Sequence, residues 1–281
     1  MTATVERMLP LYEAKMIHQF DHRWATYDPD GSVRDVTLAE KQDPTFVALP
    51  RYWVREEVVR DRLGDRWNHD WLLGWRDICR STDERTMIAS QLPVSAVGHT
   101  MPLALTTAVD PALLQSLWSS FVFDYVARQK VGGTHMTYGY LTQLATALPQ
   151  TSPPWRTGQP EWFTSRARFL QTPQSWTTNI RASVRAELDA AWFHIFGLGR
   201  EDVDYIMESF PIVKRKDEAE FGSYRTKELI LEAYDAMQAA IEAGCAYQSP
   251  LEAEQPGPLW VPGSKRQVWS TPRSSLAAIT R

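Results

Sequence analysis

The sequence predicts a mixed α/β fold of the α+β kind, with strands early in the chain and helices late. β-leaning residues dominate residues 71–79 and 85–93, and a polar turn joins these two segments into a hairpin. Apolar residues recur at helical spacing over residues 113–126, and again over residues 180–196 and 229–241. We therefore expect a strand-containing first part followed by a helical second part.

The composition indicates a soluble protein of the reducing cytoplasm. A chain of 281 residues that is 43% hydrophobic can bury a sizeable core, in one large domain or two modest ones. Cys79 and Cys245 lie too far apart in sequence to suggest a disulfide framework or a metal-ligand pair. The first residues lack the apolar core of a signal peptide, and no apolar run is long enough to cross a bilayer. We expect a cytoplasmic location and no membrane partner.

Residues 113–149 form the most informative stretch of the chain. Their pattern predicts a helix, a tight loop and then a second helix or a strand. The loop combines cations, hydrogen-bonding side chains and bare glycine backbone, namely Arg128, Lys130, Gly132, Gly133, Thr134 and His135. This combination suits a phosphate or the edge of a base. The alternative is that the glycines simply end a helix and the cations are solvated.

Positive charge is concentrated in one segment of an acidic chain. The net charge of −4 alone disfavours a protein that binds the nucleic-acid backbone. Residues 125–185, however, contain seven basic residues and one acidic residue, a net charge of +6, so the remainder carries −10. Arg166 and Arg168 in this segment are therefore further candidates for contact with an anionic partner. A solvated surface is the other explanation of such a charge run.

The N-terminal segment and the hairpin add further candidate cations. Lys15 and Arg23 belong to an aromatic segment that ends in a turn at residues 28–31. The hairpin region contributes three arginines, Arg76, Arg80 and Arg85. Arginine is the side chain best shaped for guanine edges and phosphate, but arginines that alternate with aspartates fit internal salt bridges equally well.

Two motifs suggest chemistry that the rest of the sequence does not support. His18 and His22 are four residues apart, which on a helix brings two imidazoles to one metal, but no third ligand follows the pattern. Residues 152–155 read Ser-Pro-Pro-Trp, a form that some amino-methyltransferases use to hold a flipped base. Such an enzyme also needs a glycine-rich loop after a strand for S-adenosylmethionine, and none appears. We expect no metal site and no catalytic residue.

The C-terminal part is expected to be helical. A first helix over residues 179–196 ends at Gly197, and a second begins with acidic residues near residue 200 and is halted by Pro211. Residues 214–224 are then expected to form a charged loop, and residues 225–243 a third helix capped by Gly244. An irregular tail follows.

The sequence divides into four expected parts. Residues 1–150 make a first domain, which also includes a further expected strand within residues 95–108. Residues 151–178 form a Pro-rich linker and basic segment, residues 179–245 a helical domain, and residues 246–281 a largely irregular tail.

Four blocks of the sequence carry a resemblance to a known family. They are residues 11–28 (LYEAKMIHQFDHRWATYD), residues 76–93 (RDICRSTDERTMIASQLP), residues 120–144 (SFVFDYVARQKVGGTHMTYGYLTQL) and residues 188–236, which begin LDAAWFHIFGLGREDVDYIMESFP. In this order they resemble the C-terminal half of large bacterial adenine-N6 DNA methyltransferases. That family includes fused restriction-modification enzymes and the methylases of BREX and DISARM phage-defence systems. The resemblance extends to about residue 243.

The resemblance implies a specificity module that recognises double-stranded DNA. In the family this half is the target-recognition region, and its fold is similar to the specificity-subunit domains of Type I restriction systems. The methyltransferase domain, with its cofactor-binding glycines and its NPPY-type tetrapeptide, would lie before Met1. We therefore expect a catalytic methyltransferase partner, a separate chain or domain, that binds S-adenosylmethionine.

Under this hypothesis, cations on the loops contact phosphates, while Arg76, Arg80, Arg128 or His135 reach base edges. The Lys130→Ala and Arg128→Ala changes should then weaken DNA binding. Two alternatives remain open at this point. One is a self-contained methyltransferase that uses residues 152–155, and the other is an interaction, scaffold or antirestriction protein that does not bind DNA.

Overall fold

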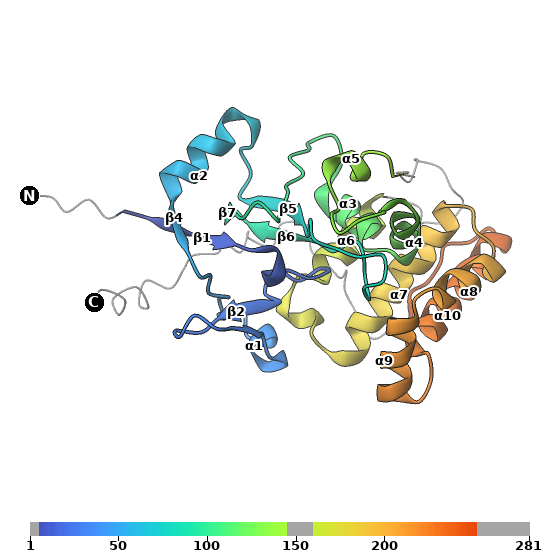
Figure 1. Cartoon of the computed structure of the whole chain (residues 1–281). Coiled ribbons are helices and arrows are strands. Elements are labelled where there is room, and N and C mark those ends of the chain that lie inside the picture. Colours follow the sequence, from blue (N-terminus) through green and yellow to red (C-terminus); the bar gives the residue numbers. More distant parts are fainter. Residues whose placement is uncertain (1–5, 145–159, 252–281) are drawn as a thin grey trace, which may run out of the picture.

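A hairpin of strands β5 (Trp71–Trp75) and β6 (Ala89–Pro93) lies where the sequence predicts one. The computed structural model describes residues 6–144 and 160–251 (Figure 1). The two strands pair antiparallel, with Leu73 opposite Gln91, and Leu73 is fully buried. Because strands and helices both contribute to the described part, the predicted mixed α/β class is confirmed.

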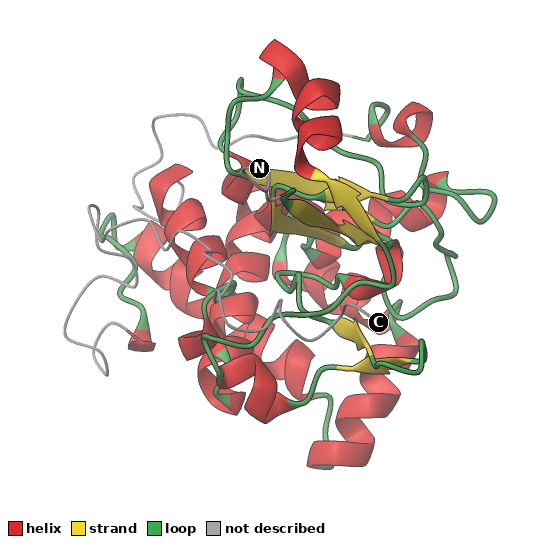
Figure 2. Cartoon of the chain, turned by 90° about the vertical axis from the view of Figure 1, so that its left-hand side faces the viewer, coloured by secondary structure: helices red, strands yellow, loops and turns green. Residues whose placement is uncertain are grey.

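Two further small sheets come from the N-terminal part. β1 (Met8–Tyr12) pairs antiparallel with β4 (Trp53–Arg55) and parallel with β7 (Ala96–Val97). β2 (Ala25–Tyr27) and β3 (Val33–Asp35) form a separate antiparallel pair, set apart from the other strands in Figure 2. The predicted turn at residues 28–31 joins β2 to β3 and is confirmed. Residues 95–108, expected to form a strand, contribute only the two residues of β7.

Short helices and three-residue turns lie between strands and between the longer helices. The α-helices are α1 (Leu38–Gln42), α2 (Glu56–Leu63) and α5 (Tyr138–Leu141), and the three-residue 3-10 turns are Ala14–Met16, Gly64–Arg66 and Pro173–Ser175. Thr37 and Glu40 form a capping box at the start of α1. Arg60 and Arg62 lie on the exposed side of α2.

The helix predicted from residue 113 onward is two helices, α3 (Pro111–Trp118) and α4 (Phe121–Lys130). Ser120 caps α4, because its hydroxyl accepts a hydrogen bond from the backbone N–H of Phe123 at 3.3 Å. The apolar spacing continues across the break, so periodicity alone does not reveal it. The start of α4 is thereby fixed, and the Gly132-Gly133 loop follows its last turn.

The described second part contains the helices α6 (Pro160–Phe169), α7 (Thr178–Ile195), α8 (Arg200–Glu208), α9 (Pro211–Phe221) and α10 (Arg225–Glu242), of which α7 to α10 lie on the right of Figure 1. α7 and α10 pack along each other. The predicted ends at Gly197 and Gly244 are confirmed, since both glycines adopt the left-handed backbone, with φ of 68° and 63°.

The charged loop predicted at residues 214–224 is wrong, because residues 211–221 form α9. The predicted stop of the preceding helix is confirmed, since α8 ends at Glu208, before Pro211. Pro211 also occupies the first turn of α9, where its missing N–H costs no hydrogen bond. Lys, Arg, Glu and Ala, which follow, are strong helix formers. Gly222 ends α9 with φ of 79°. A charged sequence was therefore mistaken for an irregular one.

The larger apolar cluster extends across the boundary predicted at residue 150. It contains Trp75, Trp118 and Phe123 from the first predicted domain, together with Trp192 and Phe210 from the second. A smaller cluster lies around β1, β5 and α2. The described parts of the two predicted domains therefore share one core. Residues 145–159, which include the motif at 152–155, lie outside the described residues, as do residues 252–281.

Candidate nucleic-acid interface

Two loops lie together at the end of the β5–β6 hairpin. One follows β5 over residues 76–84, and the other follows α4 over residues 131–137. The backbone N–H of Cys79 donates to the carbonyl of Thr134 at 3.0 Å, and the N–H of Met136 donates to the carbonyl of Asp77 at 2.6 Å. The indole N–H of Trp75 also donates to the Met136 carbonyl, at 2.8 Å. The hairpin therefore fixes the glycine loop in place.

Six exposed residues of these loops and of the end of α4 are named here the loop surface. They are Arg80, Lys130, Gly132, Gly133, Thr134 and His135. Neither the Arg80 guanidinium nor the Lys130 ammonium makes a hydrogen bond or an ion pair with another residue that the structure describes. Both charges are therefore available to an anionic partner. The sequence predicted five of these residues, all but Arg80, as one contact loop together with Arg128, and it predicted Arg80 as a separate candidate in the hairpin region. The hydrogen bond between Cys79 and Thr134 brings Arg80 next to that loop.

Neither close packing nor a left-handed backbone requires glycine at positions 132 and 133. A Cβ at either position would meet no atom within 4 Å, and neither residue lies in the left-handed region. Their backbone N–H groups donate to no other described residue. A side chain at either position would cover this backbone. With glycine there, the peptide N–H groups of residues 132 and 133 stay exposed to solvent. Such groups are ready donors for a phosphate oxygen.

His135 is positioned by Asp77. The Nδ1 atom of His135 lies 2.6 Å from the Asp77 carboxylate, and the imidazole is about half exposed, with 55% of its side-chain surface accessible. The contact fixes the plane of the ring and directs the Nε2 atom away from Asp77. Nε2 is therefore the atom of His135 that can meet a ligand.

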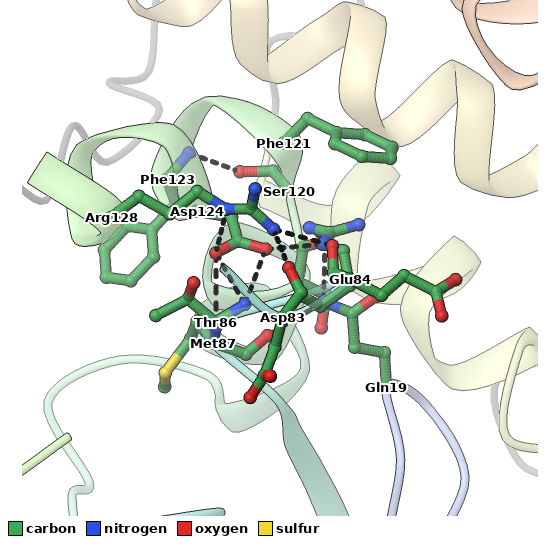
Figure 3. A network of polar contacts seen from close by, with 12 residues as sticks. Gln19, Asp83, Glu84, Thr86, Met87, Ser120, Phe121, Phe123, Asp124 and Arg128 are labelled. Atoms are coloured by element: carbon green, nitrogen blue, oxygen red, sulfur yellow. Dashed lines mark hydrogen bonds and ion pairs between the residues drawn. The ribbon is translucent and has the colours of Figure 1, made fainter. Parts of the chain in front are cut away.

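Asp124 organises the polar network behind the loop surface (Figure 3). Its carboxylate is fully buried and accepts hydrogen bonds from the Arg85 guanidinium at 2.5 Å and from the backbone N–H groups of Thr86 and Met87. Arg85 also donates to the carbonyl of Ser119 at 2.7 Å. The network connects the segment that leads into β6 to the start of α4.

Arg128 completes this network from the last turn of α4. Its Nη2 atom donates to the carbonyls of Asp83 and Glu84 at 2.6 and 2.7 Å, and its guanidinium lies over the Phe210 ring. Burial lowers the pKa of Arg128. Arg85 and Arg128, both predicted to contact DNA, therefore bind the chain itself. The sequence did contain a signal for Asp124, since it is the single acidic residue in the apolar run of α4. A carboxylate buried in such a run requires hydrogen-bond or ion-pair partners.

Other arginines that were predicted to contact DNA also form hydrogen bonds or ion pairs within the chain. Arg23 is buried and donates to the carbonyls of Lys41, Asp43 and Phe46. Arg76 donates twice to the Ile17 carbonyl. Arg166 is buried against Glu187, and Arg168 pairs with Asp110.

Lys15 is exposed, 3.3 Å from the Glu13 carboxylate and above the Tyr27 ring. The Lys15 ammonium therefore already forms an ion pair with an acidic residue of the chain. Arg23, Arg85, Arg128 and Arg166 are held by partners within the chain, so they are not part of the loop surface.

The positive charge run at residues 125–185 does not form one basic face. Arg181 donates to the carbonyls of Leu170 and Phe20, and Arg185 donates to the Gln19 side chain at 3.0 Å. Burial lowers the pKa of both arginines. These cations join α7 to the N-terminal segment, so most of the run, among its described residues, serves internal packing.

Asp189 of α7 is a buried acid that supports the start of α4. Its carboxylate accepts a hydrogen bond from the Phe121 backbone N–H at 2.7 Å. Burial raises its pKa from 3.8 to about 6, and the charge of Arg85 opposes this effect. A raised folded-state pKa means that the stability contributed by this group is fully present below pH 3.8 and is lost as the pH rises through about 6.

The Asp189→Asn variant should therefore lose this pH dependence. Its amide oxygen can still accept from Phe121, while no charge is buried at high pH. Since each pKa unit corresponds to about 1.4 kcal/mol, we expect the stability of the variant relative to wild type to rise by up to about 3 kcal/mol from pH 4 to pH 7. Urea unfolding at several pH values measures this difference. A difference that does not change with pH contradicts the assignment.

A hollow of about 250 Å³ opens beside the loop surface. Its lining consists of His18, Arg76, Ile78, Cys79, Asp83, Glu84, Arg85, Thr86 and Ile88. Burial lowers the pKa of His18 well below its ordinary value and raises that of the Cys79 thiol to about 11, so both side chains are neutral at pH 7. The sequence did not predict this hollow, because its residues come from separate segments.

The described residues contain neither a metal cluster nor a membrane span. No group of three or more His, Cys, Asp or Glu side chains in this part of the chain lies close enough to hold a metal ion. None of the described helices combines the length and apolar character needed to cross a bilayer. Comparisons with protein-family models, with curated proteins and with solved structures find no match for this chain.

Proposed function

We propose that the chain is a sequence-specific DNA recognition module of a restriction-modification or phage-defence system that methylates adenine at N6. It binds double-stranded DNA in the cytoplasm and directs a catalytic methyltransferase partner. S-adenosylmethionine binds to that partner. The recognition fold then belongs with the specificity-subunit domains of Type I restriction systems.

The loop surface is the observation that carries this proposal. Arg80 and Lys130, whose charged groups pair with none of the described residues, belong to the same surface as two glycines whose backbone N–H groups donate to none of those residues. Cations and peptide N–H groups together bind phosphate oxygens, and they set the position of a protein on a duplex. His135, held by Asp77, adds a side chain that can donate to or accept from a base edge.

Salt-dependent DNA binding tests the proposal. Replacing Arg80 or Lys130 with alanine should weaken binding to duplex DNA and should reduce the slope of log affinity against log salt concentration by about 1 for each residue. The double variant should reduce the slope by about 2. Fluorescence anisotropy with a labelled duplex, beginning at low salt, measures both quantities.

Arg62→Ala is the matched control, since Arg62 is an exposed cation on α2, which packs against the β1–β4 sheet. We expect that this variant keeps the wild-type slope. Equal slopes for wild type and the Arg80, Lys130 double variant would contradict the loop surface as the phosphate contact. Complete absence of binding to any duplex at low salt would instead favour an interaction protein that needs its catalytic partner.

A further inference from the structure

We propose that the hollow beside the loop surface binds a guanine base. This deepens the proposed function and rests on it for the source of the base, which is DNA held on the loop surface. The site itself is made by residues of this chain and can be tested with free nucleotides.

The hollow has the size and the walls for a bicyclic ring. A cavity of about 150 Å³ holds benzene, and this hollow measures about 250 Å³. Ile78 and Ile88 contribute apolar side chains to its lining. Ile78 is 56% exposed, a large fraction for such a side chain, and it provides apolar surface against which a flat ring can pack.

Arg76 supplies a donor for the acceptor atoms of guanine. It uses Nε and Nη2 on the Ile17 carbonyl, and no described residue pairs with its Nη1 group. Arg85 also lines the hollow, but it is 4% exposed and its Nη1 atom, which has no hydrogen-bond partner among the described residues, is buried, so the direct contact is assigned to Arg76. Guanine O6 and N7 are the base atoms that arginine binds most often.

Two carboxylates supply acceptors for the donor groups of guanine. One oxygen of Asp83 accepts the backbone N–H of Arg80, and one oxygen of Glu84 pairs with Lys216, so each carboxylate keeps a second oxygen. The N–H and amino groups of guanine are donors that such oxygens can accept. Adenine offers no comparable pair of donors beside an acceptor.

The charge of the lining favours a neutral ligand over an anion. Arg76 and Arg85 are balanced by Asp83 and Glu84, and the neutral His18 and Cys79 side chains add no charge. Because these charges cancel, the lining offers an inorganic phosphate no net electrostatic attraction. A base that has both donor and acceptor atoms can bind Arg76 and the carboxylates of the lining at the same time.

Titration of the full chain with dGMP, dAMP and inorganic phosphate, followed by NMR chemical shifts, tests the site. We expect dGMP to bind at least about tenfold more tightly than dAMP or phosphate. Glu84→Gln should weaken dGMP binding about tenfold. Lys216→Gln is its matched control, because it removes the partner of Glu84 but keeps the carboxylate, and it should not weaken binding. Ile78→Trp, at an exposed position, should fill the hollow and abolish binding.

The outcomes separate this inference from the proposed function. Equal binding of dGMP and phosphate, or no binding of dGMP, overturns the guanine site even if the loop surface binds duplex DNA. Binding of dGMP that Ile78→Trp leaves unchanged also overturns it. Selective dGMP binding that depends on Glu84 supports the site, and if duplex binding is absent, only the proposed function fails.

Discussion

Replacing Asp124 with alanine is expected to lower the free energy of unfolding by about 3–5 kcal/mol. The carboxylate is fully buried and is the acceptor for the Arg85 guanidinium. It also accepts from the backbone N–H groups of Thr86 and Met87 and lies 3.8 Å from the Nε atom of Arg128. Without it, two partly or fully buried guanidinium groups lose their shared negative charge and two buried N–H groups lose their acceptor.

Urea unfolding at pH 7 measures this loss, with Asp235→Ala as the matched control. Asp235 pairs with Arg200 at 2.8 Å, but both side chains are about half exposed, so we expect a loss of at most about 1 kcal/mol. Asp124→Asn keeps one acceptor oxygen without the charge and should give an intermediate loss. If Asp124→Ala costs no more than Asp235→Ala, the network does not stabilise the fold as described.

The strands and helices that the sequence predicted are those with strong patterns in the local sequence. α7 and α10 carry apolar residues at helical spacing, and clear glycine stops end both helices. The β5–β6 hairpin was predicted from β-leaning residues on either side of a polar turn. α9 was missed because its sequence is charged on most faces, and helix propensity rather than periodicity forms it. The break before α4 was missed because Ser120 acts as a cap without changing the apolar spacing.

The site could be predicted only where its residues are adjacent in sequence. The glycine loop places Lys130, Gly132 and His135 together by chain connectivity alone. Most of the arginines could not be assigned, because their partners lie elsewhere in the chain. Arg85, for example, meets Asp124, and Arg181 meets the Phe20 carbonyl. The sequence alone does not distinguish an arginine that faces solvent from one that pairs with a buried carboxylate. Only the fold distinguishes them.

Replacing Asp21 with alanine is also expected to destabilise the fold by about 3–5 kcal/mol. Asp21 and Lys41 are each 5% exposed, and the Lys41 ammonium lies 2.7 Å from the Asp21 carboxylate. The ammonium also lies 4.3 Å from the ring centroids of Trp24 and Trp176. Burial lowers the pKa of Lys41, whereas Asp21 raises it. Removing Asp21 therefore leaves a desolvated cation with only the faces of two aromatic rings.

The Lys41→Met change distinguishes a buried charge from a packing defect. Methionine keeps an unbranched side chain between Trp24 and Trp176 but carries no charge. In the Asp21→Ala background we expect it to restore about half or more of the lost stability, because replacing both partners of a buried pair removes the uncompensated charge. A double-mutant cycle of urea unfolding measures this coupling. If the losses of the two single variants simply add in the double variant, the pair is not coupled, and the cost of Asp21→Ala comes instead from its hydrogen bond to the Arg23 backbone N–H.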